Sequence, residues 1–149
     1  MPSQVSAGKV GTDSTVWNRM LLLHAHVENR LSTALQRRHG LGLSEYRALS
    51  FLDQAENDEL RMQELADKLG LNQSSVTRLV GRLNSAEFTY RDLCPDDKRG
   101  VYTVITDAGR RRYQEASATY NETLSAALDE VAATDPAIAA ILATARETA

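Results

Sequence analysis

The stretch from Leu60 to Leu83 reads "LRMQELADKLGLNQSSVTRLVGRL" and contains two helical patterns separated by a short turn. The first pattern covers about Met62–Leu69, and Gly70 is a residue type that commonly ends a helix. The second covers about Gln73–Ala86, with Asn72 as its predicted N-cap. Two helices joined by a short turn that contains glycine are typical of a helix-turn-helix.

The second predicted helix has two different faces. At about 100° per residue, one third of its circumference is apolar and is expected to pack on a core; this side comprises Val76, Leu79, Val80 and Leu83. The opposite side is small and polar, with Arg78 and Arg82 and no acid. Such a face is either solvated or suited to the major groove, where Arg pairs with guanine and Gln or Asn with adenine. The predicted DNA contacts here are Asn72, Gln73, Ser74, Ser75, Thr77, Arg78 and Arg82.

After this helix the pattern changes to two strands, predicted at residues 88–93 and 101–105. The loop between them carries a charged tip, in which Asp97, Lys98 and Arg99 are the predicted DNA contacts. Arg99 can reach a minor groove, where the negative potential is strongest, and Asp97 can orient its guanidinium through a bidentate pair. The simpler alternative is an ordinary charged turn.

Long helices are predicted on both sides of this region. One covers 13–39 and carries an apolar stripe. Apolar periodicity and start signals predict three more helices, at 44–54 with Ser44 as N-cap, at 107–133, and from Pro136 onward. The stripes exceed what a small lobe can cover, which predicts a homodimer. The expected fold is mainly α with a small β-wing. The expected regions are a disordered leader (1–12), an N-terminal dimerisation helix (13–42), a winged helix-turn-helix (43–105) and C-terminal dimerisation helices (106–149).

Composition restricts the class of protein without naming it. The 149 residues have a formal net charge of −3, but residues 73–112 hold eight basic and five acidic side chains. Positive charge is therefore concentrated around the predicted helix-turn-helix, as a nucleic-acid footprint requires. The longest apolar run, Met20–Leu23, is far shorter than the roughly 20 residues of a membrane helix. A single cysteine and the lack of a secretory signal fit a cytoplasmic protein.

Two segments, "LRMQELADKLGLNQSSVTRLVGRL" and "PDDKRGVYTVITDAGR", resemble the winged helix-turn-helix of the MarR (multiple antibiotic resistance regulator) family. The specific elements are the wing pattern Asp97-x-Arg99-Gly100 and the segment Ile105–Gly109. The resemblance spans about 43–112. It implies a homodimeric transcription regulator, usually a repressor, that binds pseudo-palindromic double-stranded DNA without a cofactor. Many such proteins release DNA when they bind a small phenolic or other aromatic anion.

One departure from the family pattern concerns the residues after the recognition helix. Family members commonly have glycine there, whereas this chain has Asn84-Ser85-Ala86-Glu87. If that turn needs a positive φ, either Asn84 or Glu87 must adopt it, at some cost in strain.

The resemblance also places an effector pocket between the first helix and the DNA-binding lobe. Position and chemistry select aromatic residues for stacking and cations for a carboxylate, namely Trp17, Arg19, His24, Tyr46 and Arg47. A tyrosine at the position of Tyr46 is more often a core residue, and a histidine like His24 more often has a structural role.

Other functions have less support in the sequence. His24 and His26 are about 200° apart around a helix and cannot share a metal ion. No catalytic or phosphate-binding pattern is present, so we expect no enzyme. Two alternatives stay open: a winged-helix module that binds protein, and a regulator that senses oxidants through Cys94.

Overall fold

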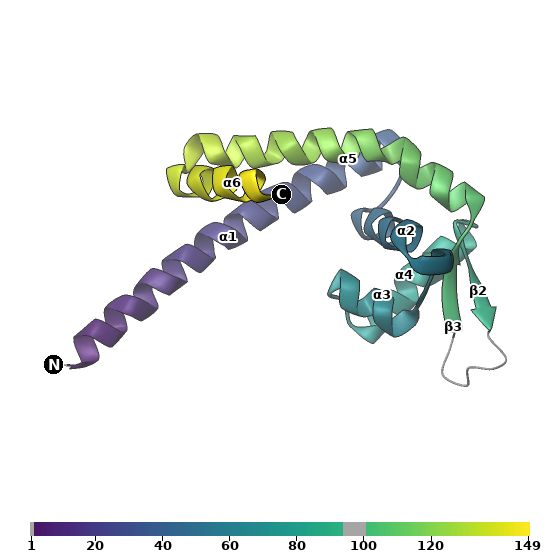
Figure 1. Cartoon of the computed structure of the whole chain (residues 1–149), viewed down its shortest axis with the longest axis horizontal. Helices are drawn as coiled ribbons and strands as arrows, with labels where there is room; N and C mark the ends of the chain where they lie inside the picture. The colour runs from purple at the N-terminus through teal and green to yellow at the C-terminus, as the bar shows by residue number, and fades with distance from the viewer. Residues whose placement is uncertain (1, 94–100) are drawn as a thin grey trace. The chain divides into compact units, whose positions relative to one another are not determined.

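The computed structural model describes residues 2–93 and 101–149, with side chains from Gly11 onward (Figure 1). The helices are α1 (Pro2–His39), α2 (Leu43–Gln54), the 3-10 helix η1 (Glu56–Asp58), α3 (Met62–Leu69), α4 (Gln73–Ser85), α5 (Asp107–Thr134) and α6 (Pro136–Thr148). The strands are β1 (Glu59–Arg61), β2 (Thr89–Leu93) and β3 (Val101–Ile105). The chain divides into two compact units, Leu35–Thr119 and the combination of Met1–Ala34 with Tyr120–Ala149. The mainly α fold with a small sheet agrees with the sequence prediction.

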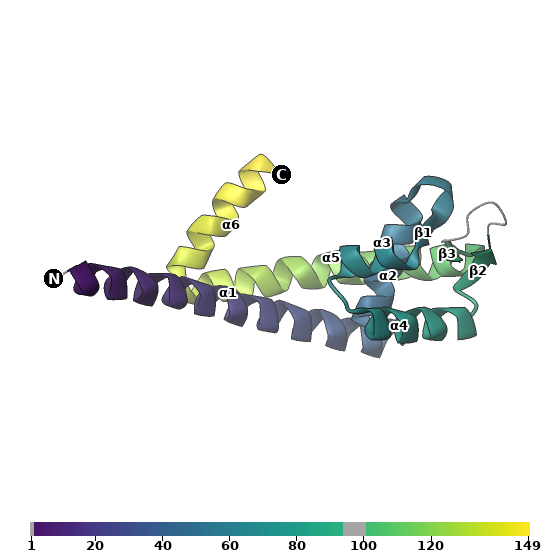
Figure 2. The ribbon, with the colours of Figure 1, turned by 90° about the horizontal axis from the view of Figure 1, so that it is seen from below.

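The unit Leu35–Thr119 contains α2, α3, α4 and the antiparallel sheet, which group together in Figures 1 and 2. The strand order is β1-β3-β2, with Leu60 opposite Thr103 and Tyr90 opposite Val104. Its core consists of apolar side chains that are almost completely removed from water, including Leu49, Leu52, Leu65, Val76, Leu79 and Leu83. Burial of these side chains holds the two helices of the helix-turn-helix against α2.

The second unit combines most of α1 with the later part of α5 and with α6. Glu130 of α5 accepts hydrogen bonds from His26 and Arg30 of α1, each at 2.7 Å. Asp135 caps α6 by accepting from the backbone N–H of Ala137 and Ile138. Polar contacts therefore join α1 to α5, while Ile138 supplies a buried apolar anchor for α6.

Three sequence predictions need correction. Helix α1 begins at Pro2 rather than near Asp13, so a helix covers residues 2–12 instead of a disordered leader; once a helix exists, each added residue gains a hydrogen bond at little further cost. Helix α2 is capped at Gly42 and not at Ser44, because the Gly42 N–H donates to the Glu45 carboxylate. The strand β1 was missed because three residues are too short to show a period.

Candidate nucleic-acid interface

Helix α4 separates its apolar and polar side chains as the sequence predicts. Val76, Leu79, Val80 and Leu83 are buried. The exposed side chains on the other side are Gln73, Ser74, Thr77, Arg78 and Arg82, with Gly81 between them and Ser75 half-buried. The exposed face presents two guanidinium groups and no carboxylate of its own. This face can therefore attract a phosphate chain and still approach it closely, since most of its other side chains are small.

The N-terminal end of α4 is ordered by its own side chains. Asn72 Oδ1 accepts hydrogen bonds from the Ser75 N–H and from the Ser74 hydroxyl, both at 2.9 Å. The Thr77 hydroxyl donates to the Gln73 carbonyl oxygen at 2.8 Å. The Asn72 oxygen is thus occupied by the cap, whereas its amide N–H groups and the Gln73 side chain can still make contacts at this end.

The two arginines of the polar face have different surroundings. Arg82 Nε donates to Glu45 Oε1 of α2 at 3.3 Å. Arg78 forms no ion pair with any acid in the described part of the chain. Arg78 therefore has its full hydrogen-bonding capacity for a base, whereas Arg82 is tied to the lobe through one of its donors.

The turn after α4 joins the recognition helix to the sheet and to α5. Glu87 adopts a φ of +64°, which confirms one of the two predicted positions for a left-handed residue. Its carbonyl oxygen accepts from the Thr106 hydroxyl at 2.7 Å, and the Phe88 carbonyl oxygen accepts from the Thr106 N–H at 3.0 Å. A Cβ at Gly109 would lie 2.1 Å from that Phe88 oxygen, so only glycine fits there. The segment 105–109 thus fixes the base of the wing.

The tip of the wing lies outside the described residues. The predicted contacts Asp97, Lys98 and Arg99 are in the segment 94–100, as is Cys94 of the redox alternative. The strands that carry this tip are paired from Thr89 opposite Ile105 to Leu93 opposite Val101. The described structure therefore supports a two-stranded wing, and the roles of its tip residues stay predictions.

The sequence reasoning missed two polar residues near the start of α4. Arg61 and Gln63, at the start of α3, share a hollow of about 530 Å³ with Gln73 and Val101. Arg61 Nε donates to the Tyr102 hydroxyl at 3.0 Å, and its guanidinium lies 5.4 Å from the centre of that ring. The first helix of a helix-turn-helix crosses the DNA backbone, which makes both side chains candidate phosphate contacts. The sequence analysis could not place Arg61 because it did not predict β1, the strand that pairs Arg61 with Tyr102.

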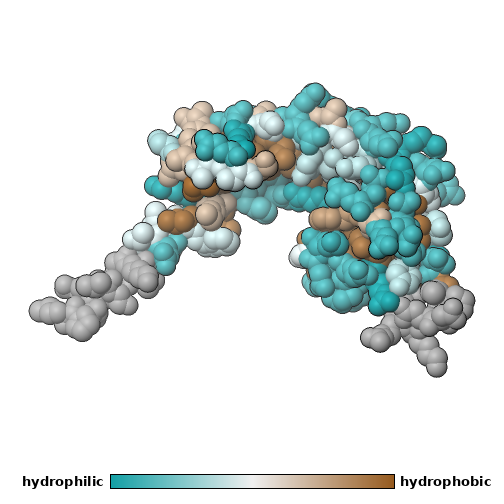
Figure 3. Space-filling view, viewed as in Figure 1, coloured by the Kyte–Doolittle hydropathy of each residue, from teal (hydrophilic) through white to brown (hydrophobic). Residues whose placement is uncertain are grey.

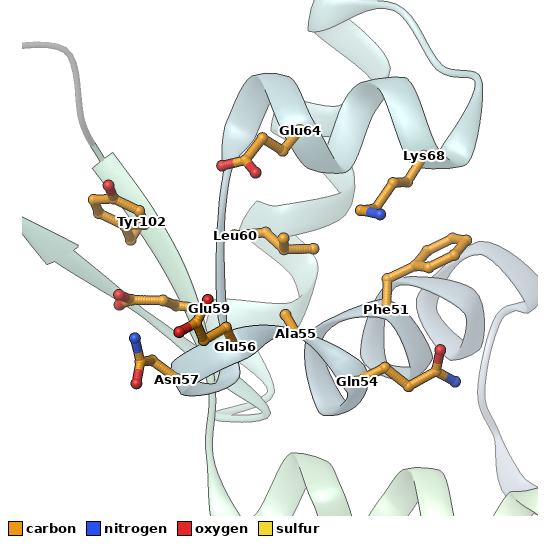
Figure 4. Close-up of a pocket in the computed structure, with 10 residues that line it drawn as sticks. All are labelled: Phe51, Gln54, Ala55, Glu56, Asn57, Glu59, Leu60, Glu64, Lys68 and Tyr102. Atoms are coloured by element: carbon orange, nitrogen blue, oxygen red, sulfur yellow. The ribbon is translucent and has the colours of Figure 1, made fainter.

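A second hollow, of about 540 Å³, has a different chemistry (Figure 4). Glu56, Glu59 and Glu64 line it, and the one basic side chain in its lining, Lys68, lies 5.7 Å from the ring centre of Phe51. Three carboxylates against one ammonium group repel a phosphate. We therefore assign no DNA contact to this hollow.

The five candidate ligand residues are divided between the two units. Trp17, Arg19 and His24 belong to the unit with α6, while Tyr46 and Arg47 belong to the unit with the helix-turn-helix. Trp17 is 60% exposed. Arg19 lies 3.7 Å from Asp135, and His24 lies 3.8 Å from Glu28.

Tyr46, by contrast, is a core residue of its unit. It is buried, and its ring centre lies 5.2 Å from that of Tyr113. Tyr46 therefore lies in the core, which is the more common place for such a residue.

The described residues offer neither a metal site nor a membrane-spanning helix. No three side chains of the His, Cys, Asp and Glu types come together there in a way that could hold a metal ion. None of the described helices has an apolar stretch of membrane-spanning length.

Comparison with known sequences identifies the helix-turn-helix region. The sequence profile of the MarR family matches residues 39–100. These 62 residues, 39–100, are similar to the MarR family. Proteins of this family are transcription regulators rather than enzymes.

Individual relatives extend this result to the fold. The transcriptional regulator MhqR of Bacillus subtilis is 32% identical over 72 residues, which are 48% of this chain and 48% of MhqR, so the match spans about half of that relative. The MarR-family regulator Sco3205 of Streptomyces coelicolor, solved in complex with DNA, is 25% identical. It has a TM-score of 0.73 over 91% of this chain and 86% of its own.

A third relative was solved with a small molecule. The MarR-family protein Rv2887 of Mycobacterium tuberculosis, in complex with p-aminosalicylic acid, is 22% identical with a TM-score of 0.61. The match covers 74% of this chain and 82% of Rv2887. At this identity the likeness shows the fold alone.

Proposed function

We propose that this chain is a cytoplasmic, DNA-binding transcription regulator of the MarR family. The observation that carries the proposal is the exposed face of α4, which holds Arg78 and Arg82 without an acid, opposite four buried apolar residues. In this proposal the N-terminal half of α4 enters the major groove, and Asn72, Gln73, Ser74, Ser75, Thr77 and the two arginines contact bases or phosphates. Support also comes from Sco3205, a relative solved on DNA.

The wing extends the contact beyond the major groove. We assign Arg99 to an adjacent minor groove, Asp97 to orienting it and Lys98 to the phosphate chain. The sequence pattern of the wing and the observed pairing of β2 with β3 support this assignment.

The working form of the protein is a homodimer on a pseudo-palindromic operator. Large apolar side chains of α1 and α6 are exposed in the single chain, namely Val16, Trp17, Met20, Leu21, Leu22 and Ile141. Apolar surface (brown) accordingly gathers in Figure 3 where α1 and α6 lie in Figure 1. A second copy of the chain is the partner that this surface fits best.

We further propose repression that a small aromatic acid relieves. The support is the match of residues 39–100 to the MarR family, together with Rv2887, a protein of similar fold that was solved in complex with p-aminosalicylic acid. Arg19 and Arg47 are the candidate partners of the carboxylate, and Trp17, His24 and Tyr46 are candidates for the ring. Operator DNA and ligand must weaken each other's binding by the same factor, so a ligand affinity unchanged by saturating operator excludes a switch.

A mobility-shift titration with random-sequence duplex at low salt tests the central proposal. Binding that weakens steeply as salt rises is expected, because phosphate contacts release counterions. Absence of binding at low salt would favour the alternative of a winged-helix module that binds protein.

A further inference from the structure

Arg82 is attached to the lobe by a carboxylate that is itself held in place. Arg82 Nε donates to Glu45 Oε1 at 3.3 Å, and the Gly42 backbone N–H donates to Glu45 Oε2 at 3.3 Å. The Glu45 side chain is 21% exposed, whereas the Arg82 side chain is 58% exposed. Both oxygens of the carboxylate are therefore engaged, one by the start of α2 and one by the recognition helix.

This arrangement leaves the outer part of the guanidinium available. An arginine has five N–H donors in a rigid, planar fork. The contact with Glu45 uses the Nε–H, and the Nη groups have no partner among the described residues. The side chain is thus fixed at its inner nitrogen while its outer nitrogens face solvent.

The position of Arg82 along α4 suits a phosphate. Arg82 is nine residues after Gln73, about 13.5 Å along the helix axis. When the N-terminal end of α4 enters the groove, the far end lies where the sugar–phosphate chain borders that groove.

The contact has little use as a simple stabilising pair. An ion pair this exposed adds little to folding stability, and four buried side chains already hold α4 on the core. Its more evident effect is to remove rotamers from a long side chain before DNA arrives, so that less entropy is lost on docking.

We propose that Glu45 is a positioning residue for DNA binding, which fixes the guanidinium of Arg82 so that its Nη groups face a backbone phosphate. The inference rests on the proposed function, in that α4 must contact DNA. It also predicts that loss of the negative charge of Glu45 weakens DNA binding. Removal of an acid near DNA should tighten binding by electrostatics alone, whereas loss of positioning should weaken it.

The test uses the full-length protein and one duplex that the wild type selects from a random-sequence pool. Arg82→Ala should weaken binding and reduce the slope of log affinity against log salt by about one. Glu45→Ala should weaken binding by roughly three- to tenfold, through the freed rotamers of Arg82. Glu45→Gln should bind less tightly than the wild type but more tightly than Glu45→Ala, because its single amide oxygen can accept from either Nε or the Gly42 N–H, whereas its NH2 group can accept from neither. The double variant Glu45→Ala/Arg82→Ala should bind no worse than Arg82→Ala.

Two further variants separate positioning from folding and from charge. Glu45→Asp keeps the charge and suits a helix start but shortens the reach to Arg82, so it should weaken binding as Glu45→Ala does. Glu64→Ala is the matched control. Glu64 accepts from the Arg61 N–H at the start of α3 at 3.2 Å, so its loss removes the same charge and the same type of cap. It should not weaken binding.

The outcomes distinguish the two proposals. If Arg82→Ala binds DNA as tightly as the wild type, this end of α4 does not contact DNA, and the positioning role of Glu45 is also contradicted. Weak binding by Arg82→Ala together with wild-type or tighter binding by Glu45→Ala and Glu45→Asp would overturn the positioning role alone.

Discussion

At the scale of single residues, Glu87 shows how a backbone requirement is met by an unusual residue type. Its φ of +64° lies in the left-handed region, which costs a non-glycine residue about 1–2 kcal/mol. The sequence left Asn84 and Glu87 as alternatives. Asn84 remains within α4, where its Oδ1 accepts from the Thr89 hydroxyl at 2.6 Å, so the turn must occur at Glu87.

Glu87→Gly should therefore stabilise the protein by up to about 1 kcal/mol, because glycine adopts this φ without strain. Thermal unfolding checks the prediction. Ser85→Gly, which places glycine at a helical φ in the last turn of α4, is the control and should destabilise the protein. A lower melting temperature for Glu87→Gly would contradict the account.

Replacement of Gly109 by alanine and replacement of Gly81 by alanine should change the stability of the protein in opposite directions. A Cβ at Gly109 would lie 2.1 Å from the Phe88 carbonyl oxygen, so Gly109→Ala should cost about 1–3 kcal/mol or more in stability. Gly81 lies within α4 and has nothing within 4 Å of its added Cβ, so Gly81→Ala should stabilise by about 0.5–1 kcal/mol. Chemical denaturation of both variants tests the pair, and equal effects would refute it.

Arg78→Ala should reduce base specificity, because a groove-facing arginine can discriminate between bases by about 1–3 kcal/mol. The measurement compares the affinity of both proteins for the selected duplex and for single-base variants of it. A loss of affinity that is the same on every sequence would make Arg78 a phosphate contact instead.

At the scale of elements, periodicity sufficed for the parts that have a regular apolar side. The bounds predicted for α3, Met62–Leu69, are those observed, and the end of α4 differs by one residue. The same reasoning placed the polar face of α4, and with it most of the candidate site. The Glu45–Arg82 contact could not be predicted, since the two residues are 37 positions apart and only the packing of α2 on α4 brings them together.

Variants of the wing test the same question as those of Glu45, namely whether removal of an acid near DNA weakens or tightens binding. Arg99→Ala should lower affinity on all duplexes and reduce the salt slope by about one. Asp97→Ala should also weaken binding if Asp97 orients Arg99, although it removes a negative charge near DNA. Tighter binding by Asp97→Ala at low salt would mean that both residues are ordinary charges of a turn.

The ion cluster between α1 and α5 predicts a pH dependence. Hydrogen bonds from His26 and then from Arg30 lower the pKa of Glu130 below its ordinary value of 4.5. A lowered pKa means that folding favours the carboxylate, so this stabilisation is present above about pH 4.5 and is lost as the pH falls through the folded-state pKa. Glu130→Gln should flatten melting temperature against pH in that range. Glu122→Gln, on the exposed side of α5, should not.

At the scale of the whole molecule, the proposal of a dimer rests on the exposed apolar side chains of α1. The predicted stripe is buried at Val27 and Leu31, but Val16 and Met20 at its N-terminal end are exposed in the single chain. In α6, Ile138 is already buried within one chain, whereas Ile141 is 47% exposed and is the residue of this helix that we propose for the interface. The sequence could not show which apolar residues are buried within one chain and which are exposed, because both sets belong to the same periodic pattern.

Leu22→Glu should dissociate the proposed dimer, because Leu22 is 72% exposed in the single chain and a buried charge there would be unpaired. Sedimentation at micromolar concentration provides the measurement. Leu93→Glu, at an exposed leucine of β2, is the control and should leave the dimer intact. A wild-type protein that sediments as a monomer would reject the dimer, and with it half-sites spaced about one helical turn apart.

The division of α4 into a buried side and an exposed side also matters to anyone who wishes to redirect such a regulator. Folding depends on four apolar positions, while the surface offered to DNA depends on others, so the second set can be randomised in a library without disturbing the first. New operator preferences are then open to selection from a stable scaffold. Gly109, where an added Cβ would lie 2.1 Å from the Phe88 carbonyl oxygen, belongs with the positions that such a library should leave unchanged.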